Sequence, residues 1–163
     1  MTMPVNRTVN VSVVFNCVQN GANDFGGSAT YTQSSSTPSD LGNVVDSNGN
    51  IDLRQASAYD PSQYNDSVDF VFTLAPQSTG YVTPVVWASR NGAGATIVVP
   101  QGGNAQEFQV EQSSATPQLL TIVDNDDDSN TYNYKPAVEL PNFDHYYISL
   151  DPRIVNKPSS TNK

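Results

Sequence analysis

The chain has 163 residues, of which 7 are basic and 16 are acidic, giving a net charge of −9. Its length fits one domain with a core of its own, and its acidic balance excludes nucleic acids and anionic membranes, which attract a cationic surface. Charged residues make up 14% of the chain, against about 25% in ordinary soluble domains, and their places are taken by 18 Ser, 13 Thr, 17 Asn and 10 Gln. We therefore expect a surface rich in neutral hydrogen-bonding groups.

The first strongly patterned segment begins near the N-terminus. Every second residue in it is apolar: Val9, Val11, Val13, Phe15 and Cys17. A period of two places one set of side chains in a core and the other set towards solvent, so this segment predicts a β-strand. Cys17, the only cysteine, continues the apolar side, which favours a buried, unreactive thiol and excludes an internal disulfide.

Further β-rich runs follow, separated by Asn-Gly and Gly-Gly pairs that are typical of turns. The predicted strands cover residues 68–74, 82–88, 96–99, 107–112, 119–123, 131–140 and 146–150, and residues 44–53 predict a hairpin. Pro136 interrupts the run 131–140, which predicts an edge strand or two pieces. Residues 33–39, rich in Ser and Thr, predict a surface loop, and helix is predicted only as single turns near residues 53–58 and 61.

Eight or nine short strands at close spacing are the pattern of a β-sandwich or a β-barrel, and of the two we expect an antiparallel β-sandwich. We expect one all-β domain over residues 1–163, with a flexible tail at residues 157–163. The first residues lack the pattern of a secretory signal, and no 18 consecutive residues are apolar. The expectation is a cytoplasmic protein with no membrane contact.

One acidic cluster follows the run 119–123. Oxygen ligands at Asp124, Asp126 and Asp128 would suit a calcium ion, although the spacing does not match an EF-hand, which requires Gly at its sixth position. Asp and Asn are equally typical of solvated turns. A Ca²⁺ site and a solvated connection therefore both remain open, with the turn favoured.

The sequence offers little for catalysis. His145 is the only histidine, and no G-x-S-x-G elbow presents a nucleophilic serine. His145 is expected in a loop between strands, and Trp87 in the core. The prediction is that the chain is not an enzyme and needs no cofactor, unless Ca²⁺ binds.

Tyrosines provide a second candidate site. Tyr132 and Tyr134 share one side of a predicted strand, while Tyr146 and Tyr147 point to opposite sides, with Tyr147 taken as the exposed one. Exposed tyrosines beside Asn and Asp can stack on sugars, and they are also typical of protein interfaces. We therefore consider Tyr132, Tyr134 and Tyr147 as ligand-binding residues.

The C-terminal third resembles a known family in several motifs: Leu119-Leu-Thr-Ile-Val-Asp-Asn-Asp126, Tyr132-Asn-Tyr134, Val138-Glu-Leu140 and Leu150-Asp-Pro-Arg-Ile-Val-Asn-Lys-Pro158. These are similar to the DP-EP family of small bacterial proteins. The resemblance implies an immunoglobulin-like β-sandwich whose function is uncharacterised and supplies no catalytic residues. More distantly, the terminal Asp-Pro element is similar to that of PixA/AidA-type inclusion-body proteins, which would favour self-association.

Two functions follow as hypotheses. The first is a non-catalytic binding or self-assembly domain that forms homo-oligomers, since the surface is polar and neutral and no reactive constellation is present. The second is a calcium-assisted carbohydrate-binding module that uses the acidic cluster and the tyrosines.

Overall fold

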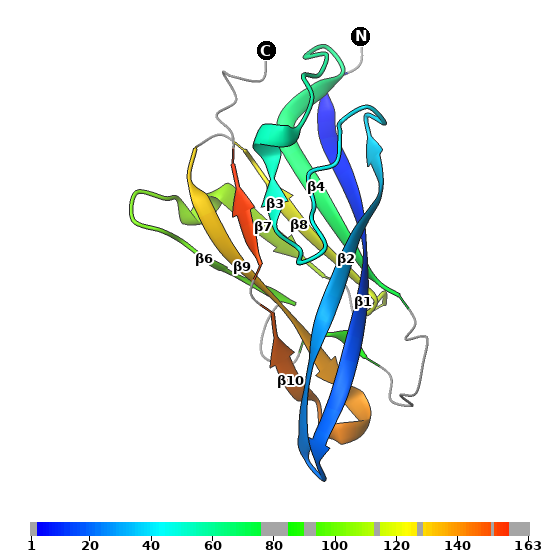
Figure 1. Ribbon diagram of the computed structural model, residues 1–163. Coiled ribbons are helices and arrows are strands. Elements are labelled where there is room, and N and C mark those ends of the chain that lie inside the picture. The colour runs from blue at the N-terminus through cyan, green and yellow to red at the C-terminus, as the bar shows by residue number, and fades with distance from the viewer. Residues whose placement is uncertain are drawn as a thin grey trace.

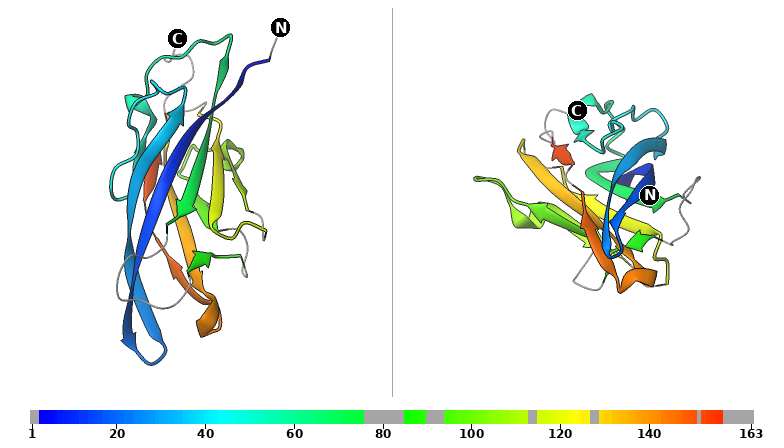
Figure 2. Two further views of the ribbon diagram at one scale, coloured as in Figure 1. Left: turned by 90° about the vertical axis from the view of Figure 1, so that its right-hand side faces the viewer. Right: turned by 60° about the horizontal axis from the view of Figure 1, so that its bottom comes forward.

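The computed structural model describes residues 3–75, 85–89, 94–112, 115–126, 129–150 and 152–156. Within them, two β-sheets pack face to face, as Figures 1 and 2 show, so the predicted all-β sandwich is confirmed. The predicted tail at 157–163, the start of the predicted strand 82–88 and Asp128 lie outside the described residues. No helix in the described part is long and apolar enough to cross a membrane.

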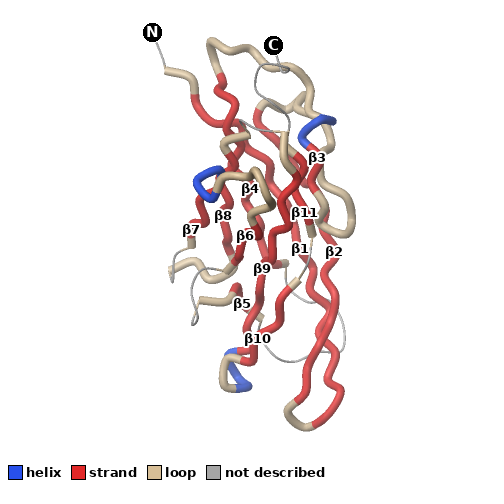
Figure 3. Tube along the Cα trace, turned by 90° about the vertical axis from the view of Figure 1, so that its left-hand side faces the viewer, coloured by secondary structure: helices blue, strands red, loops and turns tan. Residues whose placement is uncertain are grey.

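The described part of the chain contains eleven strands and three short 3-10 helices. Figure 3 shows how they follow one another along the chain. The strands are β1 (Val5–Gly21), β2 (Asp24–Thr37), β3 (Ile51–Asp52), β4 (Tyr64–Leu74), β5 (Val86–Trp87), β6 (Ala95–Val98), β7 (Phe108–Glu111), β8 (Leu119–Asp124), β9 (Thr131–Leu140), β10 (Tyr146–Ser149) and β11 (Arg153–Val155). The helices are η1 (Leu53–Gln55), η2 (Ala105–Glu107) and η3 (Pro141–Phe143).

The first sheet has the order β2-β1-β4-β8-β7. The second is built around β9, which pairs with β10 and β11 and also with β5 and β6. Both sheets are mixed, because β1 runs parallel to β4 and β3 runs parallel to β11. The predicted antiparallel arrangement therefore holds for the other strand pairs and fails for these two. Parallel neighbours need a long connection, and β2 together with residues 38–63 supplies it between β1 and β4.

The alternation that predicted β1 is confirmed. The side chains of Val9, Val11, Val13, Phe15 and Cys17 are all buried in the core between the sheets. Apolar residues of β4 and β8 continue that layer, since Val9 lies opposite Phe70 and Phe70 lies opposite Ile122.

Strand β2 corrects two predictions, because the loop predicted at 33–39 and the turn predicted at Gly26-Gly27 both lie largely within it. Its inward side chains include Phe25 and Tyr31, and it pairs with β1 almost along its whole length to form a long hairpin (Figure 2). Gly27 fits because a Cβ there would lie 2.2 Å from the carbonyl oxygen of Asn16. The glycine marks a close approach of two strands rather than a turn.

Strand β9 corrects a third prediction, because it runs unbroken through Pro136 in the middle of its sheet. Proline lacks the N–H that a central strand donates. Here Pro136 faces the junction where the chain leaves β10 for β11, and its carbonyl accepts the N–H of Leu150 at 2.8 Å. The ladder loses the bond that an N–H at residue 136 would donate, but this position lies beyond the end of β10, so the strand tolerates the proline.

Candidate functional site

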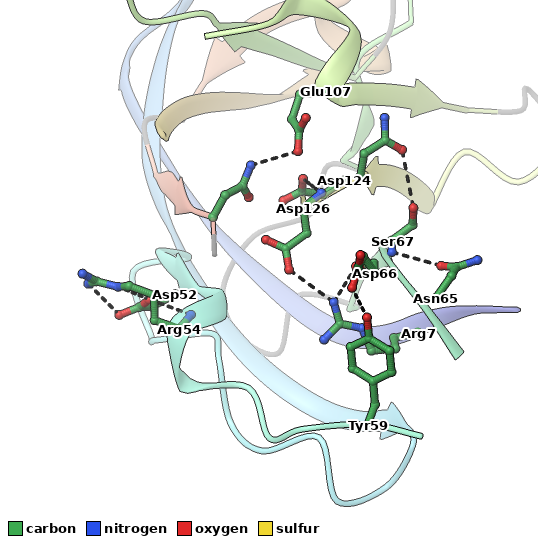
Figure 4. A network of polar contacts seen from close by, with 12 residues as sticks. Arg7, Asp52, Arg54, Tyr59, Asn65, Asp66, Ser67, Glu107, Asp124 and Asp126 are labelled. Carbon is green, nitrogen blue, oxygen red and sulfur yellow. Dashed lines mark hydrogen bonds and ion pairs between the residues drawn. The ribbon is translucent and has the colours of Figure 1, made fainter. Parts of the chain in front are cut away.

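Five buried polar side chains gather at the end of the sandwich where β1 begins and β8 ends. They are Arg7, Glu107, Asp124, Asp126 and Asn156, and we call them the acid–arginine cluster. Figure 4 labels the first four. Charged side chains are almost never fully buried unless they are paired. The cluster is therefore the most unusual chemical environment among the described residues.

Strand register brings the cluster together. Arg7 lies in phase with Val9 on the inward side of β1, and Asp124 lies in phase with Leu120 and Ile122 on the inward side of β8. Val68 of β4 pairs with both Arg7 and Asp124, which places the two charged residues in one row across the sheet. The row closes the apolar core with polar groups.

Arg7 is only 1% exposed, and its guanidinium contacts three residues. Its guanidinium donates to Oδ2 of Asp126 at 3.2 Å and to the backbone carbonyl of Asp66. It also lies over the ring of Tyr59, with 4.6 Å between its Cζ and the ring centroid, and the hydroxyl of Tyr59 donates to the Asp66 carboxylate. A cation over an aromatic face is attracted by the negative charge density of the ring.

Glu107 connects the cluster to the second sheet. The side-chain amide of Asn156, just after β11, donates to Oε1 of Glu107 at 3.2 Å. The backbone carbonyl of Glu107 accepts the N–H of Asn125 at 2.9 Å. Asn104 caps η2 by accepting the N–H of Gln106, so the helical turn that carries Glu107 is fixed at its start.

Asp124 has the most perturbed carboxyl group of the cluster. Its Oδ1 accepts the N–H of Asp126 at 2.9 Å. Burial raises the pKa of Asp124 well above the usual range, and the neighbouring charges of Asp126 and Glu107 raise that pKa further. Burial and repulsion both favour the protonated form of Asp124, which can donate a hydrogen bond to Glu107.

The structure corrects the favoured interpretation of the acidic segment. Asp124 and Asp126 are fully buried, so a solvated turn is wrong for these two residues. Asp126 lies beside the guanidinium of Arg7, which supplies positive charge where the metal hypothesis places an ion. Among the described residues, which exclude Asp128, no three acidic, histidine or cysteine side chains are arranged to hold a metal. The Ca²⁺ site stays a prediction.

The tyrosine hypothesis is wrong for two of its three residues. Tyr132 and Tyr134 lie on the inward side of β9 and are fully buried, so neither can stack on a sugar in solution. The hydroxyl of Tyr132 accepts the N–H of Asn104 at 3.0 Å, and that of Tyr134 donates to the carbonyl of Gly49. Tyr147, which is 46% exposed, is the only one of the three on the surface.

His145 lies between η3 and β10, in the connection that was predicted for it. Its Nδ1 is 2.9 Å from Oε2 of Glu139, a buried carboxylate that also accepts the N–H of Ser89 at 3.0 Å. The predicted burial of Trp87 and Cys17 is confirmed. The contact between His145 and Glu139 arises because β9 and β10 form a hairpin, and no sequence motif predicts this contact.

A groove of about 590 Å³ runs between β2 and the loop at residues 39–47. Most of its lining is neutral and polar, including Thr32, Ser35, Asn43 and Ser47, and Asp46 adds one carboxylate. The side chain of Gln33 joins the two walls, because its Nε2 donates to the Gly42 carbonyl and its Oε1 accepts the Val44 N–H. Such a lining offers mainly neutral hydrogen-bonding groups.

The outer side of β6 is an open sheet edge. Strand β6 pairs with β9 on one side, and no strand of the described residues pairs with the other side. Val98 is 41% exposed and Val99 is 40% exposed, while residues 91–106 contain no charged residue. By contrast, β7 at the edge of the first sheet ends in Glu111, and β3 and β5 have only two residues each.

No protein-family model matches the chain, and no curated protein sequence matches it.

Proposed function

We propose that the chain is a non-catalytic domain that associates with copies of itself. The observation that carries this proposal is the open, uncharged edge of β6 on an otherwise strongly acidic chain. An edge strand presents unpaired N–H and C=O groups that a second strand can use, and proteins usually protect such an edge with charges or proline. The four residues of β6 contain neither.

The polar groups of the acid–arginine cluster support the same proposal. They are fully buried and bind one another, so they hold strands together and are withdrawn from any substrate in solution. The distant resemblance to PixA/AidA-type proteins would also favour self-association. The resemblance to the DP-EP family adds to this proposal only an immunoglobulin-like sandwich.

Association is expected to increase with protein concentration and with salt. Each copy carries a net charge of −9, and salt screens the repulsion between two copies because the Debye length falls to about 10 Å at 0.1 M. Light scattering coupled to size-exclusion chromatography, run at several concentrations and at low and high salt, measures the mass directly. A strict monomer under every condition would contradict the proposal.

The groove beside β2 favours carbohydrate binding as a second candidate function, because neutral hydroxyl and amide groups are the partners that sugar hydroxyls use. We expect Thr32→Arg, which places a large charge in the groove, to abolish binding of neutral glycans on a glycan array. Thr30→Arg is the matched control, since Thr30 is exposed on the same strand but does not line the groove. Equal binding by both variants, or none by the natural chain, would remove this candidate.

A further inference from the structure

We infer that two copies of the chain join through their β6 strands, which pair antiparallel about a twofold axis at Ile97 and extend the second sheet across the dimer. This inference rests on the proposed self-association and names the surface and the register that it uses.

The hydrogen bonds between β6 and β9 fix which backbone groups of β6 are free. Ala95 pairs with Pro136 and Val98 with Asn133, and the N–H of Ala137 donates to the carbonyl of Gly94 at 2.8 Å. In an antiparallel ladder, alternate residues bond to the partner and the rest point away. Residues 94, 96 and 98 therefore face β9, and Ala95, Ile97 and Val99 direct their N–H and C=O groups outwards.

Pro136 supports this assignment independently. Its carbonyl bonds to Leu150 on the far side of β9, so it makes no backbone bond towards β6. Ala95, which lies opposite Pro136, accordingly has no partner on β9 for its own backbone groups. Its N–H and C=O are left for the outer side.

Only one register uses all three outward residues in a symmetric pair. Ile97 of one copy lies opposite Ile97 of the other, and Ala95 lies opposite Val99 in both directions, so the interface is self-complementary. In this register Thr96 lies opposite Val98 of the second copy as a pair without mutual hydrogen bonds. Both side chains are exposed in the single chain.

Charge favours a second copy as the occupant of this edge. Two acidic chains repel each other wherever carboxylates meet. None of residues 94–106, which include β6, is charged, and the first charged residue after them is Glu107. Exposed β-branched side chains at Thr96, Val98 and Val99 pack well across paired strands. The β6 strand lies at the margin of the molecule in Figure 1, with its outer side clear of the other labelled strands.

Cysteine cross-linking tests the register. Thr96→Cys and Val98→Cys are made separately, each with Cys17→Ala, and the two proteins are mixed before oxidation. Pairs without mutual hydrogen bonds have Cα atoms about 4.5 Å apart, within the range of a disulfide. Residues 96 and 96 of the two copies lie on a diagonal at about 7–8 Å, which a disulfide does not span. We expect a cross-linked dimer from the mixture and at least tenfold less from either variant alone.

The other outcomes separate this inference from the proposed function. If light scattering shows association but the mixture forms no cross-link, the chain self-associates through another surface and the β6 interface is wrong. If Thr96→Cys alone cross-links as well as the mixture, the register is wrong. Val98→Lys should lower the associated fraction at least tenfold, while Val18→Lys, an exposed valine on β1, should leave it unchanged. A natural chain that stays monomeric overturns both proposals.

Discussion

Replacing Arg7 by methionine is expected to lower the free energy of unfolding by about 3–5 kcal/mol, because removal of one partner leaves buried charge without compensation. Arg7 lies against Asp126, and Asp124 and Glu107 are buried beside that pair. Methionine has a similar length but carries no charge and donates no hydrogen bond. Urea unfolding followed by circular dichroism measures the change, which would be a large share of the roughly 5–15 kcal/mol that stabilises a typical domain.

Two further variants make the test of Arg7 specific. Arg7→Lys keeps the charge but loses the planar fork that reaches Asp126 and Asp66 together, so its loss of stability should be intermediate. Arg54→Met removes an exposed arginine that pairs with Asp52, and it should leave the unfolding midpoint nearly unchanged. If Arg7→Met is as stable as the natural chain, the carboxyl groups are balanced by protons or by a bound cation instead.

Replacing Trp87 by alanine should destabilise the fold by about 3–5 kcal/mol, the usual cost of emptying a large core position. Trp87 lies on β5 of the second sheet and is fully buried. Its indole N–H donates to the carbonyl of Gln118 at 2.9 Å, immediately before β8 of the first sheet. The substitution therefore creates a cavity and also removes a direct bond between the two layers.

Trp87→Phe separates these two contributions. Phenylalanine keeps most of the apolar volume but lacks the N–H, so its stability should fall between that of the natural chain and that of Trp87→Ala. Chemical unfolding followed by far-ultraviolet circular dichroism is suitable, because Trp87 is the only tryptophan and its fluorescence is lost in both variants. Equal stability of all three proteins would show that this position does not join the sheets.

The two-residue periodicity predicts the apolar core, and the same periodicity indicates that Arg7 is buried. The alternation that buries Val9 and Val11 continues backwards to Arg7, so an arginine at an inward position already implied a buried partner. The same rule places Asp124 inward, in phase with Leu120 and Ile122. Residues 124–130 are rich in Asp and Asn, and this composition favoured a solvated turn over an inward position for Asp124. Asp and Asn favour turns whether or not the strand before them ends in the core.

Two features depend on contacts between segments that are distant in the sequence, and local sequence patterns did not predict them: strand β2 and the burial of Tyr132 and Tyr134. Strand β2 has few large apolar residues, and it is a strand because β1 offers it a long partner. Tyr132 and Tyr134 are buried because β9 has neighbours on both sides and the other sheet covers its inward side. Their polar neighbours in the sequence suggest that these tyrosines are exposed. They are buried because β9 lies in the middle of its sheet, which the local sequence does not indicate.

The two parallel pairings have a consequence for how the chain acquires its fold. Hairpins such as β1–β2 and β9–β10 join neighbouring segments, so they can form early and locally. Strand β1 gains β4, and β3 gains β11, only after distant segments have met, and the loss of chain entropy in such closures slows folding. The slowest event should therefore be the arrival of these late partners, and until then the valine-rich side of β1 is exposed to chaperones and to aggregation.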